Sequence, residues 1–368
     1  MTTNVAIILG TRPEIIRFAP IIKDLKKKKD LSLEVIHTGQ HYSYELNKIF
    51  FDELELPQPE HTLVLQSESP VKQLAEIVSK VSDVYTKLSP RLICVWGDTN
   101  SSLGAGIAAN KMHLKLMHVE AGCRSNDFNM AEEYNRIVLD HISDKLVPLA
   151  THDKQNLETE HVHGEIYLAG DPLYDVFLAK RRNLRLKGLT SLYKKRRHLG
   201  ILTLHRAENV DAEPVLRNIL EKINESLLNN NDCDLIFPIH PRTKKMLEKY
   251  NLGNLIDKNY ITVVEPLGYD ELVELLLGSD FVITDSGGFQ KEAFFAKKPC
   301  ITLRKSTEWV DTVKLKTNIL IDPSGIQKLP DIEKFLNITK VMFGNLRSAP
   351  YGNGHATEKI VRYIENSI

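Results

Sequence analysis

The sequence predicts an α/β fold of two doubly wound units, each a parallel sheet with helices on both faces. The first observation is length, because 368 residues at roughly 150 residues per domain correspond to two domains. The second is order, because short apolar strands alternate with longer helices in both halves of the chain, and this order produces parallel sheets. The third is composition, because 42% hydrophobic and 26% charged residues supply two ordinary globular cores.

In the first half, short apolar runs predict strands at residues 5–9, 33–37, 92–96, 116–119, 145–149 and 166–169. Helices are expected from Pro13 to the lysine tract at 26–29, and at 69–87, 101–111 and 132–143. Proline suits the first turn of a helix, where its missing N–H costs nothing. The helix at 101–111 is rich in alanine and glycine, so it should pack closely against its neighbours.

The second half repeats the alternation. Strands are expected at 200–204, 234–239, 261–264, 281–284 and 300–303, and helices at 211–228, 243–250, 269–278 and 288–296. Ligands of such sheets bind beyond the carboxyl ends of the strands. With two such units, we expect the site in a cleft where they face each other.

A basic segment lies between the two halves. It contains Lys and Arg without any Asp or Glu: Lys180, Arg181, Arg182, Arg185, Lys187, Lys194, Lys195, Arg196 and Arg197. The segment is either a patch for polyanions or a solvated helix and linker. The linker is favoured, because Tyr193 is the one aromatic residue there and cannot form a stacking platform.

Composition excludes several classes of protein. Lys+Arg and Asp+Glu both total 48, so the net charge is zero and nucleic-acid binding through phosphate neutralisation is not expected. No apolar run approaches the roughly 18 residues of a membrane span. We expect no secretory signal, because residues 1–5 show no basic stretch ahead of a hydrophobic segment. The four cysteines, Cys94, Cys123, Cys233 and Cys300, lack CxxC spacing, which favours small buried thiols over disulfides or zinc. We expect a cytoplasmic protein without membrane partners.

Three carboxylates and one arginine lie where a site is expected. Asp98 and Glu120 each follow a strand, so both can face one cavity at the edge of a parallel sheet, and Glu132 opens a helix. Two close carboxylates can hold split pKa values and supply one acid and one base. Asp98 could instead cap a helix, and Glu132 could complement a helix dipole. Arg12 at a helix N-terminus favours anions, or is an ordinary surface arginine.

The second half offers a nucleotide site. Residues 284–288, Thr-Asp-Ser-Gly-Gly, join a strand to a helix whose free N–H groups could hold a diphosphate, unless they form a common tight turn. Glu292 lies one turn further on and could bind the hydroxyls of a ribose. His205 and Arg206 end another strand. Neither GxGxxG nor a complete P-loop motif occurs, which argues against tightly held NAD and against a P-loop ATPase.

Several motifs together resemble the non-hydrolysing UDP-N-acetylglucosamine 2-epimerases. In chain order they are Gly-Thr-Arg-Pro-Glu at 10–14, His-Thr-Gly-Gln-His at 37–41, Gly-Asp-Thr-Asn-Ser at 97–101, His-Val-Glu-Ala-Gly at 118–122, Glu-Glu-Tyr-Asn-Arg at 132–136, His-Arg-Ala-Glu-Asn at 205–209, Thr-Asp-Ser-Gly-Gly at 284–288 and Pro-Tyr-Gly-Asn-Gly at 350–354. They keep the order of that family and span nearly the whole chain.

The resemblance implies two Rossmann-like domains of the kind found in many nucleotide-sugar glycosyltransferases (the GT-B fold), at 1–170 and 171–353. A C-terminal helix at 354–368 would return to the first domain. It also implies a homodimer and the reversible conversion of UDP-GlcNAc to UDP-ManNAc, by anti elimination of UDP to 2-acetamidoglucal and re-addition. No cofactor or metal is expected. Carried over by position, the catalytic residues are Asp98, Glu120, Glu132 and His205. The expected substrate-binding residues are Arg12, Gln40, His41, Arg136, His240, Ser286, Gly287, Gly288, Glu292 and Arg304.

The chain departs from the family pattern at several positions. Ala131 stands where proline is usual, and Lys291 stands where the pattern has the first glutamate of Gln-Glu-Glu. Residues 307–311, Thr-Glu-Trp-Val-Asp, replace Thr-Glu-Arg-Pro-Glu, a variant also associated with epimerases of UDP-diacetamido-uronic acids. Val71-Lys72 replaces the Arg-Gln pair that bacterial members use for activation at a second site, so that regulation is not expected here.

Three functions remain open at the level of sequence. They are 2-epimerisation of UDP-GlcNAc or of a related UDP-sugar, glycosyl transfer by an enzyme of the same fold, and a nucleotide-sugar sensor that converts nothing. A transferase would need one base and an acceptor groove, whereas an epimerase needs a base and an acid on opposite faces of the sugar.

Overall fold

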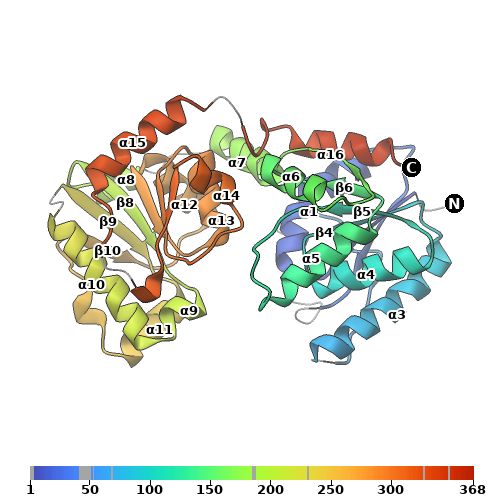
Figure 1. Cartoon of the computed structure of the whole chain (residues 1–368), viewed down its shortest axis with the longest axis horizontal. Helices are drawn as coiled ribbons and strands as arrows, with labels where there is room; N and C mark the ends of the chain where they lie inside the picture. The colour runs from blue at the N-terminus through green and yellow to red at the C-terminus, as the bar shows by residue number, and fades with distance from the viewer. Residues whose placement is uncertain are drawn as a thin grey trace. The chain divides into compact units, whose positions relative to one another are not determined.

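The structure, a computed structural model, describes residues 4–40, 51–52, 54–67, 69–184, 188–229, 232–325, 328–346 and 349–368. It forms two compact units (Figure 1), unit 1 with Met1–Val176 and Ala349–Ile368 and unit 2 with Phe177–Ser348. Among the described residues, no helix is both long and apolar enough to cross a membrane.

Unit 1 contains a parallel sheet of seven strands in the order β3-β2-β1-β4-β5-β6-β7. The strands are β1 (Val5–Leu9), β2 (Leu33–His37), β3 (His61–Thr62), β4 (Leu92–Trp96), β5 (Lys115–Val119), β6 (Lys145–Val147) and β7 (Glu165–Ile166). The helices are α1 (Arg12–Lys26), α3 (Pro70–Leu88), α4 (Asn100–Lys111), α5 (Ala131–Ile142), α6 (Thr151–Thr159) and α16 (Ala356–Glu365), and α7 (Pro172–Asn183) runs on into unit 2.

Helices cover both faces of this sheet, as β1 shows. Val5, Ile7 and Leu9 lie in one apolar cluster with α1 and α16, while Ala6 and Ile8 lie in another with α3 and α4. Burial on both faces explains why the strand is apolar at every position. The Ala- and Gly-rich α4 packs against α3, as predicted.

The C-terminal helix α16 belongs to unit 1, as the resemblance implied. Helix α16 lies along the rest of unit 1 (Figure 1). Its residues Ile360 and Ile364 are fully buried in the apolar cluster that includes α1. Its first N–H groups, of Ala356 and Thr357, donate to Asp175 of α7 at 3.1 and 2.6 Å, which satisfies the open end of the helix.

Unit 2 repeats the topology with six parallel strands in the order β10-β9-β8-β11-β12-β13. The strands are β8 (His198–Thr203), β9 (Cys233–Pro238), β10 (Ile261–Val264), β11 (Phe281–Thr284), β12 (Cys300–Thr302) and β13 (Asn318–Leu320). The helices are α8 (Leu189–Tyr193), α9 (Ala207–Val210), α10 (Glu213–Asn229), α11 (Pro241–Lys249), α12 (Tyr269–Gly278), α13 (Gly287–Phe295), α14 (Val310–Lys314) and α15 (Ile332–Gly344), with short 3-10 turns η1 (Gly253–Leu255) and η2 (Pro323–Gly325).

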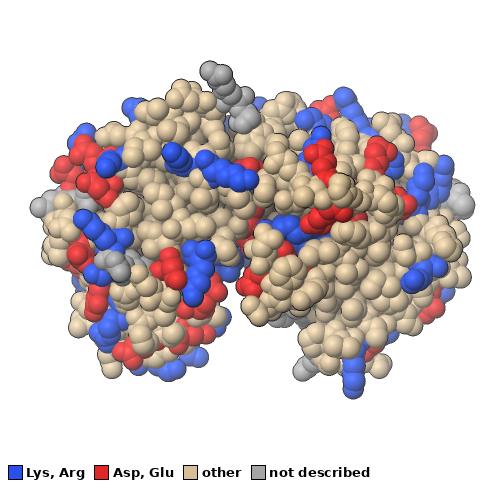
Figure 2. All heavy atoms as spheres, viewed as in Figure 1, with Lys and Arg blue, Asp and Glu red and all other residues tan. Residues whose placement is uncertain are grey.

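Charged side chains are largely balanced by neighbours. On the face shown in Figure 2, Lys and Arg lie beside Asp and Glu. In the basic segment, Lys180 pairs with Asp270, and Lys194, Arg196 and Arg197 pair with Asp280, Asp234 and Glu333 at 2.9, 2.6 and 2.9 Å. Arg185 and Lys187 lie outside the described residues. These ion pairs favour the linker over the polyanion patch.

The four cysteines, Cys94, Cys123, Cys233 and Cys300, form no disulfide and are buried. Burial raises the pKa of the Cys233 thiol to about 11, which keeps that thiol protonated at neutral pH. The prediction of small buried thiols is confirmed.

Candidate active site

In each unit several candidate residues follow the two strands at which the strand order reverses. In unit 1 these are the adjacent strands β1 and β4, followed by Gly10 and by Asp98. Such a switch point opens a crevice at the carboxyl ends of the strands. A side chain could not replace hydrogen at Gly10, because a Cβ there would lie 1.7 Å from Ser101 Oγ at the start of α4.

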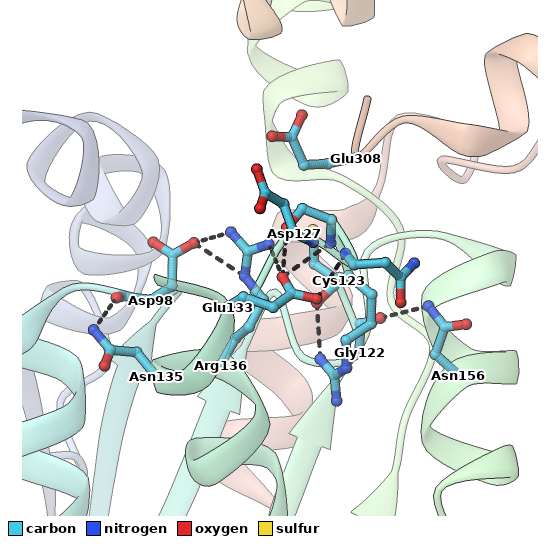
Figure 3. A network of polar contacts seen from close by, with 12 residues as sticks. Asp98, Gly122, Cys123, Asp127, Glu133, Asn135, Arg136, Asn156 and Glu308 are labelled. Atoms are coloured by element: carbon cyan, nitrogen blue, oxygen red, sulfur yellow. Dashed lines mark hydrogen bonds and ion pairs between the residues drawn. The ribbon is translucent and has the colours of Figure 1, made fainter. Parts of the chain in front are cut away.

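Asp98 is not the cap of α4. That role belongs to Thr99, whose Oγ1 accepts the N–H of Ser102 at 3.1 Å. The Asp98 carboxylate instead accepts from Arg136, with Nε at 3.1 Å, and Asn135 Nδ2 donates to the Asp98 carbonyl at 2.8 Å (Figure 3). Two residues of α5 therefore hold Asp98 in place, Arg136 at its carboxylate and Asn135 at its backbone carbonyl.

Arg136 lies between two carboxylates. Its Nη1 donates to Glu133 Oε2 at 2.8 Å, on the side away from Asp98 (Figure 3). Burial opposes ionisation of Glu133, but N–H groups of Ser125 and Asn126 at 2.9 Å, with the Arg136 charge, outweigh it and lower its pKa. Arg136, expected to bind substrate, is thus engaged in orienting Asp98.

Sequence reasoning chose Glu132 and missed Glu133. Glu132 is exposed in the first turn of α5, whereas Glu133 is fully buried. The sequence did contain a signal for the Glu133–Arg136 pair, because the two residues are three positions apart and share one helix face.

A cavity of about 790 Å³ in unit 1 is lined by Asp98, Glu132 and Gln40 among others. The Gln40 side-chain oxygen accepts from Ser101 N and Oγ, both at 2.7 Å, which ties the segment after β2 to the start of α4. His41, the other residue expected from this motif, lies outside the described residues.

Among the described residues, Glu120 is not part of the lining of that cavity. Its Oε2 accepts from Trp96 Nε1 at 3.0 Å and pairs with Arg17 of α1. Its φ of +73° is in the left-handed region, which costs free energy for a residue with a side chain. A Cβ on Gly97 would lie 3.2 Å from Glu120 Oε2, so the carboxylate sits beside the turn that carries Asp98. The sequence did not reveal Arg17.

A buried network holds the two loops that carry these carboxylates. His118 Nε2 lies 2.8 Å from the Gly97 carbonyl, and Nδ1 lies 2.7 Å from Asp140 Oδ1. Asp140 Oδ2 accepts the Gly122 N–H at 3.0 Å and pairs with Arg124 at 2.7 Å. Burial opposes the charge on Asp140, but His118 and Arg124 outweigh it and lower its pKa. The turns after β4 and β5 are therefore fastened to one carboxylate.

Arg12 is the first residue of α1, as predicted, and is exposed there. Glu14 closes the same turn: it accepts the N–H groups of Gly10 and Thr11, both at 2.8 Å, and the hydroxyl of Thr99 at 2.6 Å. The segment before Arg12 is therefore fixed against the start of α4.

In unit 2 the switch point lies between β8 and β11, and Asp285 organises it. Its carboxylate accepts the N–H groups of His205 and Arg206, both at 2.9 Å, and His205 Nδ1 lies 3.0 Å from its Oδ1. Burial opposes ionisation of Asp285, but these hydrogen bonds lower its pKa. An ionised Asp285 requires the proton of His205 on Nδ1, which leaves Nε2 for another partner.

A pocket of about 370 Å³ in unit 2 brings together many of the expected binding residues. Its lining includes His205, His240, Ser286, Gly288 and Glu292. The rings of His205 and His240 lie 5.5 Å apart, and desolvation, followed by the proximity of His205, lowers the pKa of His240. His240 also caps α11, where it accepts the Arg242 N–H at 3.2 Å.

Glu292 sits in surroundings that favour its neutral form. Burial raises its pKa to about 7, although a hydrogen bond from Tyr269 opposes the rise. At neutral pH this carboxyl group therefore changes between a hydrogen-bond donor and a pure acceptor.

The start of α13 has the form expected of an anion site. Ser286 caps it by accepting the Phe289 N–H at 3.4 Å. A Cβ on Gly288 would meet nothing within 4 Å, so its backbone is open to a ligand. Arg304 pairs with Glu308 at 3.0 and 3.1 Å, and its Nη1 lies 3.9 Å from the place of a Cβ on Gly287.

Over the described part of the chain, no His, Cys, Asp and Glu side chains are grouped so that they could hold a metal ion.

Comparison with known proteins decides the family. A family model described as UDP-N-acetylglucosamine 2-epimerase matches residues 23–365. The chain belongs to this family. A UDP-N-acetylglucosamine 2-epimerase of Methanocaldococcus jannaschii is 40% identical over 98% of this chain and 98% of that protein.

One further relative and one solved structure are informative. The UDP-2,3-diacetamido-2,3-dideoxy-D-glucuronate 2-epimerase of Pseudomonas aeruginosa is 35% identical over 97% of this chain and 98% of that protein. A crystal structure of the Methanocaldococcus jannaschii UDP-GlcNAc 2-epimerase in complex with UDP-GlcNAc and UDP is 38% identical, with a TM-score of 0.76 over 99% of this chain and 100% of that one. The resemblance inferred from the motifs and the predicted α/β fold with two parallel sheets are confirmed.

Proposed function

We propose that this 2-epimerase interconverts UDP-GlcNAc and UDP-ManNAc by inverting C2 of the hexose. The observation that carries the proposal is the 40% identity over 98% of the chain with a UDP-N-acetylglucosamine 2-epimerase. The pocket of unit 2 and the carboxylates of unit 1 supply a nucleotide site and acid–base groups for this chemistry.

The reaction requires the nucleotide to leave first or concurrently. The C2 proton of a pyranose has no neighbouring carbonyl, so its direct abstraction is very slow. As the C1–O bond to UDP breaks, positive charge at C1 acidifies the C2 proton. Anti elimination then gives 2-acetamidoglucal and UDP, and re-addition with protonation of C2 on the opposite face gives the epimer.

We assign the proton transfers to Asp98 and Glu120. The α5 contacts to Asp98 and the Arg17 and Trp96 contacts to Glu120 support this assignment, because a base must be held within hydrogen-bond reach of its proton. Glu132, which lines the cavity of unit 1 with Asp98, would orient the sugar.

The leaving group would be held by unit 2. The start of α13 at Ser286, Gly287 and Gly288 would bind the diphosphate, with Arg304 adding positive charge. Arg12, which belongs to unit 1, stays a proposed substrate-binding residue. His205, oriented by Asp285, would stabilise the departing phosphate through Nε2, with His240 beside it. Glu292 would accept the ribose hydroxyls.

A related substrate is the second candidate. The 35% identity with the UDP-2,3-diacetamido-2,3-dideoxy-D-glucuronate 2-epimerase and the residues Trp309 and Asp311 favour a UDP-diacetamido-uronic acid. A UDP-sugar of either kind uses the same elimination chemistry.

Incubation of the purified protein with UDP-GlcNAc in deuterated water tests the proposal. We expect solvent deuterium at C2 together with UDP-ManNAc, observed by NMR. The same exchange with a UDP-diacetamido-uronic acid alone would establish the second candidate. Transfer of the sugar to an acceptor without exchange at C2 would establish a glycosyltransferase, and binding without any conversion would establish a sensor.

A further inference from the structure

Two positions at which the chain departs from the family pattern lie against each other in unit 2. Lys291 belongs to α13, and its side chain is 1% exposed. Its ammonium lies 3.6 Å from the centroid of the Trp309 ring. A cation at this distance over the face of an indole is attracted by the ring, most strongly where water is excluded.

Trp309 connects this cation to the start of α13. Its Nε1 donates a hydrogen bond to the Gly287 carbonyl at 2.8 Å. That carbonyl belongs to the same peptide group as the Gly288 N–H, one of the first N–H groups of α13, which have no acceptor within the helix. Gly288 lines the pocket of unit 2.

A hydrogen bond donated to a peptide oxygen strengthens the N–H at the other end of the same group. The ammonium over the indole face withdraws electron density from the ring and makes its N–H a stronger donor. Polarisation therefore runs from Lys291 through Trp309 and the Gly287 carbonyl to the Gly288 N–H. The two side chains also fix the orientation of that peptide.

The charges around Gly287 indicate an anion as the partner. Nitrogens of Arg304 and Arg206 lie 3.9 and 4.0 Å from the place of a Cβ on Gly287, and Lys291 adds a third cation in the first turns of α13. Glu308 pairs with Arg304 at 3.0 and 3.1 Å and Glu208 lies 3.8 Å from Arg206, so these carboxylates balance part of the positive charge. Three cations close to the positive end of a helix dipole still favour a bound anion.

We propose that Lys291 and Trp309 are positioning residues that orient and polarise the Gly287–Gly288 peptide for binding the diphosphate of the UDP-sugar. The inference rests on the proposed function, because it takes the pocket of unit 2 as the nucleotide site. It assigns to this chain a way of strengthening the α13 anion site through an indole and a lysine.

Trp309→Phe tests the hydrogen bond while retaining an aromatic ring. We expect the Kd of UDP to rise about twofold to fivefold, because the substitution weakens and misorients one N–H donor and removes no hydrogen bond to UDP itself. The Kd of uridine, which lacks phosphate, should stay within about twofold, since the hydrogen bond acts on the diphosphate. Calorimetry for UDP and ligand-observed NMR for uridine give both values. Equal weakening of the two ligands would show a merely structural role and overturn the proposal.

Lys291→Met tests whether the lysine charge acts through Trp309, because methionine has nearly the same length without the charge. It should weaken UDP binding selectively, and in the Trp309→Phe background it should add little, since both changes act on one pathway. If the losses of UDP affinity in the two single variants add fully in the double variant, Lys291 does not act through Trp309 and the proposal is overturned. The control is Lys249→Met at the end of α11, where an exposed lysine lies 5.0 Å from the centroid of the Tyr250 ring. This variant should leave the Kd of UDP unchanged.

The test of Lys291 and Trp309 can fail or succeed independently of the test of epimerase activity. Wild-type protein that binds UDP without exchanging deuterium at C2 would refute the epimerase activity, whereas the ratio of the UDP and uridine affinities decides the role of Lys291 and Trp309.

Discussion

Asp98 and Glu120 are held by different kinds of neighbours. Asp98 is oriented by Arg136 and borders a cavity, whereas Glu120 is buried at 8% exposure against Arg17 and Trp96 with a left-handed backbone. Two carboxylates in unlike surroundings can divide the acid and base roles that an epimerase needs.

Asp98→Asn tests the acid–base assignment. An amide still accepts a hydrogen bond from Arg136 but does not exchange a proton with C2, so deuterium exchange should fall by about 10²- to 10⁴-fold. UDP affinity measured by calorimetry should survive. Glu158→Gln, at an exposed ion pair with Lys154, controls for the loss of a carboxylate. Turnover near that of the wild type would remove Asp98 from the mechanism.

The ionisation of Glu292 should appear in nucleoside binding. Its pKa of about 7 means that the carboxylate fraction rises between pH 6 and pH 8. If the ionised form accepts the ribose hydroxyls, uridine should bind up to about tenfold more tightly at pH 8 than at pH 6. Uridine is the suitable ligand, because it has no phosphate that titrates in this range. Glu292→Gln should abolish the dependence, and a dependence that persists in this variant would assign the titration to another group.

The same shift has a defined effect on stability. The folded-state pKa of Glu292 is raised from 4.5, so the folded protein binds the proton more strongly than the unfolded chain. Its contribution to stability is therefore greatest at low pH and is lost as pH rises from about 4.5 through about 7.

At the scale of elements, the turns after β4 and β5 depend on one buried carboxylate. Asp140 binds His118, Arg124 and the Gly122 N–H, and His118 in turn reaches the Gly97 carbonyl. The network binds the Gly97 carbonyl and the Gly122 N–H. It therefore holds the backbone next to both proposed acid–base residues.

Asp140→Asn should therefore destabilise unit 1 strongly. Glu160 still pairs with Arg124 at 2.7 Å, but asparagine loses the charge at the centre of the network and leaves buried polar groups imperfectly paired, which should lower the free energy of unfolding by about 1–3 kcal/mol. Urea denaturation measures the change. Glu165→Gln, which breaks a largely exposed pair with Lys145, should cost at most about 1 kcal/mol. Equal effects of the two substitutions would contradict a central role for the network.

The elements show what the sequence could predict. Long periodic helices such as α3 and α10 and the buried strands β1 and β4 were predicted, because their apolar spacing is set by packing. Helix α6, whose one fully buried apolar residue is Leu157, and the three-residue strand β13 were not predicted, because so few residues carry the pattern.

The site was predictable only in part. Asp98, His205 and Glu292 follow strands or a glycine turn and were recognised from that position. Arg17, Asp140 and Asp285 were not assigned roles, because their importance arises from partners distant in the chain. The contact of Lys291 with Trp309 was likewise unpredictable, although both positions were noted as departures.

At the scale of the whole molecule, the two units share one strand order, and the turns after the switch-point strands carry Asp98 in unit 1 and His205 in unit 2. Glu120 follows β5, the strand next to β4. Unit 1 supplies most of the proposed acid–base groups, and unit 2 supplies His205 and the proposed nucleotide site. Unit 1 is completed by α16, which comes from the end of the chain.

Ile360→Ala tests whether α16 is integral to unit 1. Ile360 is fully buried, so its truncation should cost about 2–5 kcal/mol. Hydrogen exchange should show lost protection in α1, against which α16 packs, while β8 and β11 of unit 2 stay protected. Ile338→Ala at an exposed position of α15 is the control and should change stability by at most about 0.5 kcal/mol. Protection of α1 unchanged by Ile360→Ala would contradict this role of α16.

The central claim is that the bond between C1 and the nucleotide breaks during inversion at C2. UDP-GlcNAc carrying oxygen-18 in the bridge between C1 and the β-phosphorus tests it directly. We expect the label to appear in non-bridging positions of the β-phosphate in recovered substrate and product, detected by ³¹P NMR. Formation of the epimer with the label entirely in the bridge would contradict it.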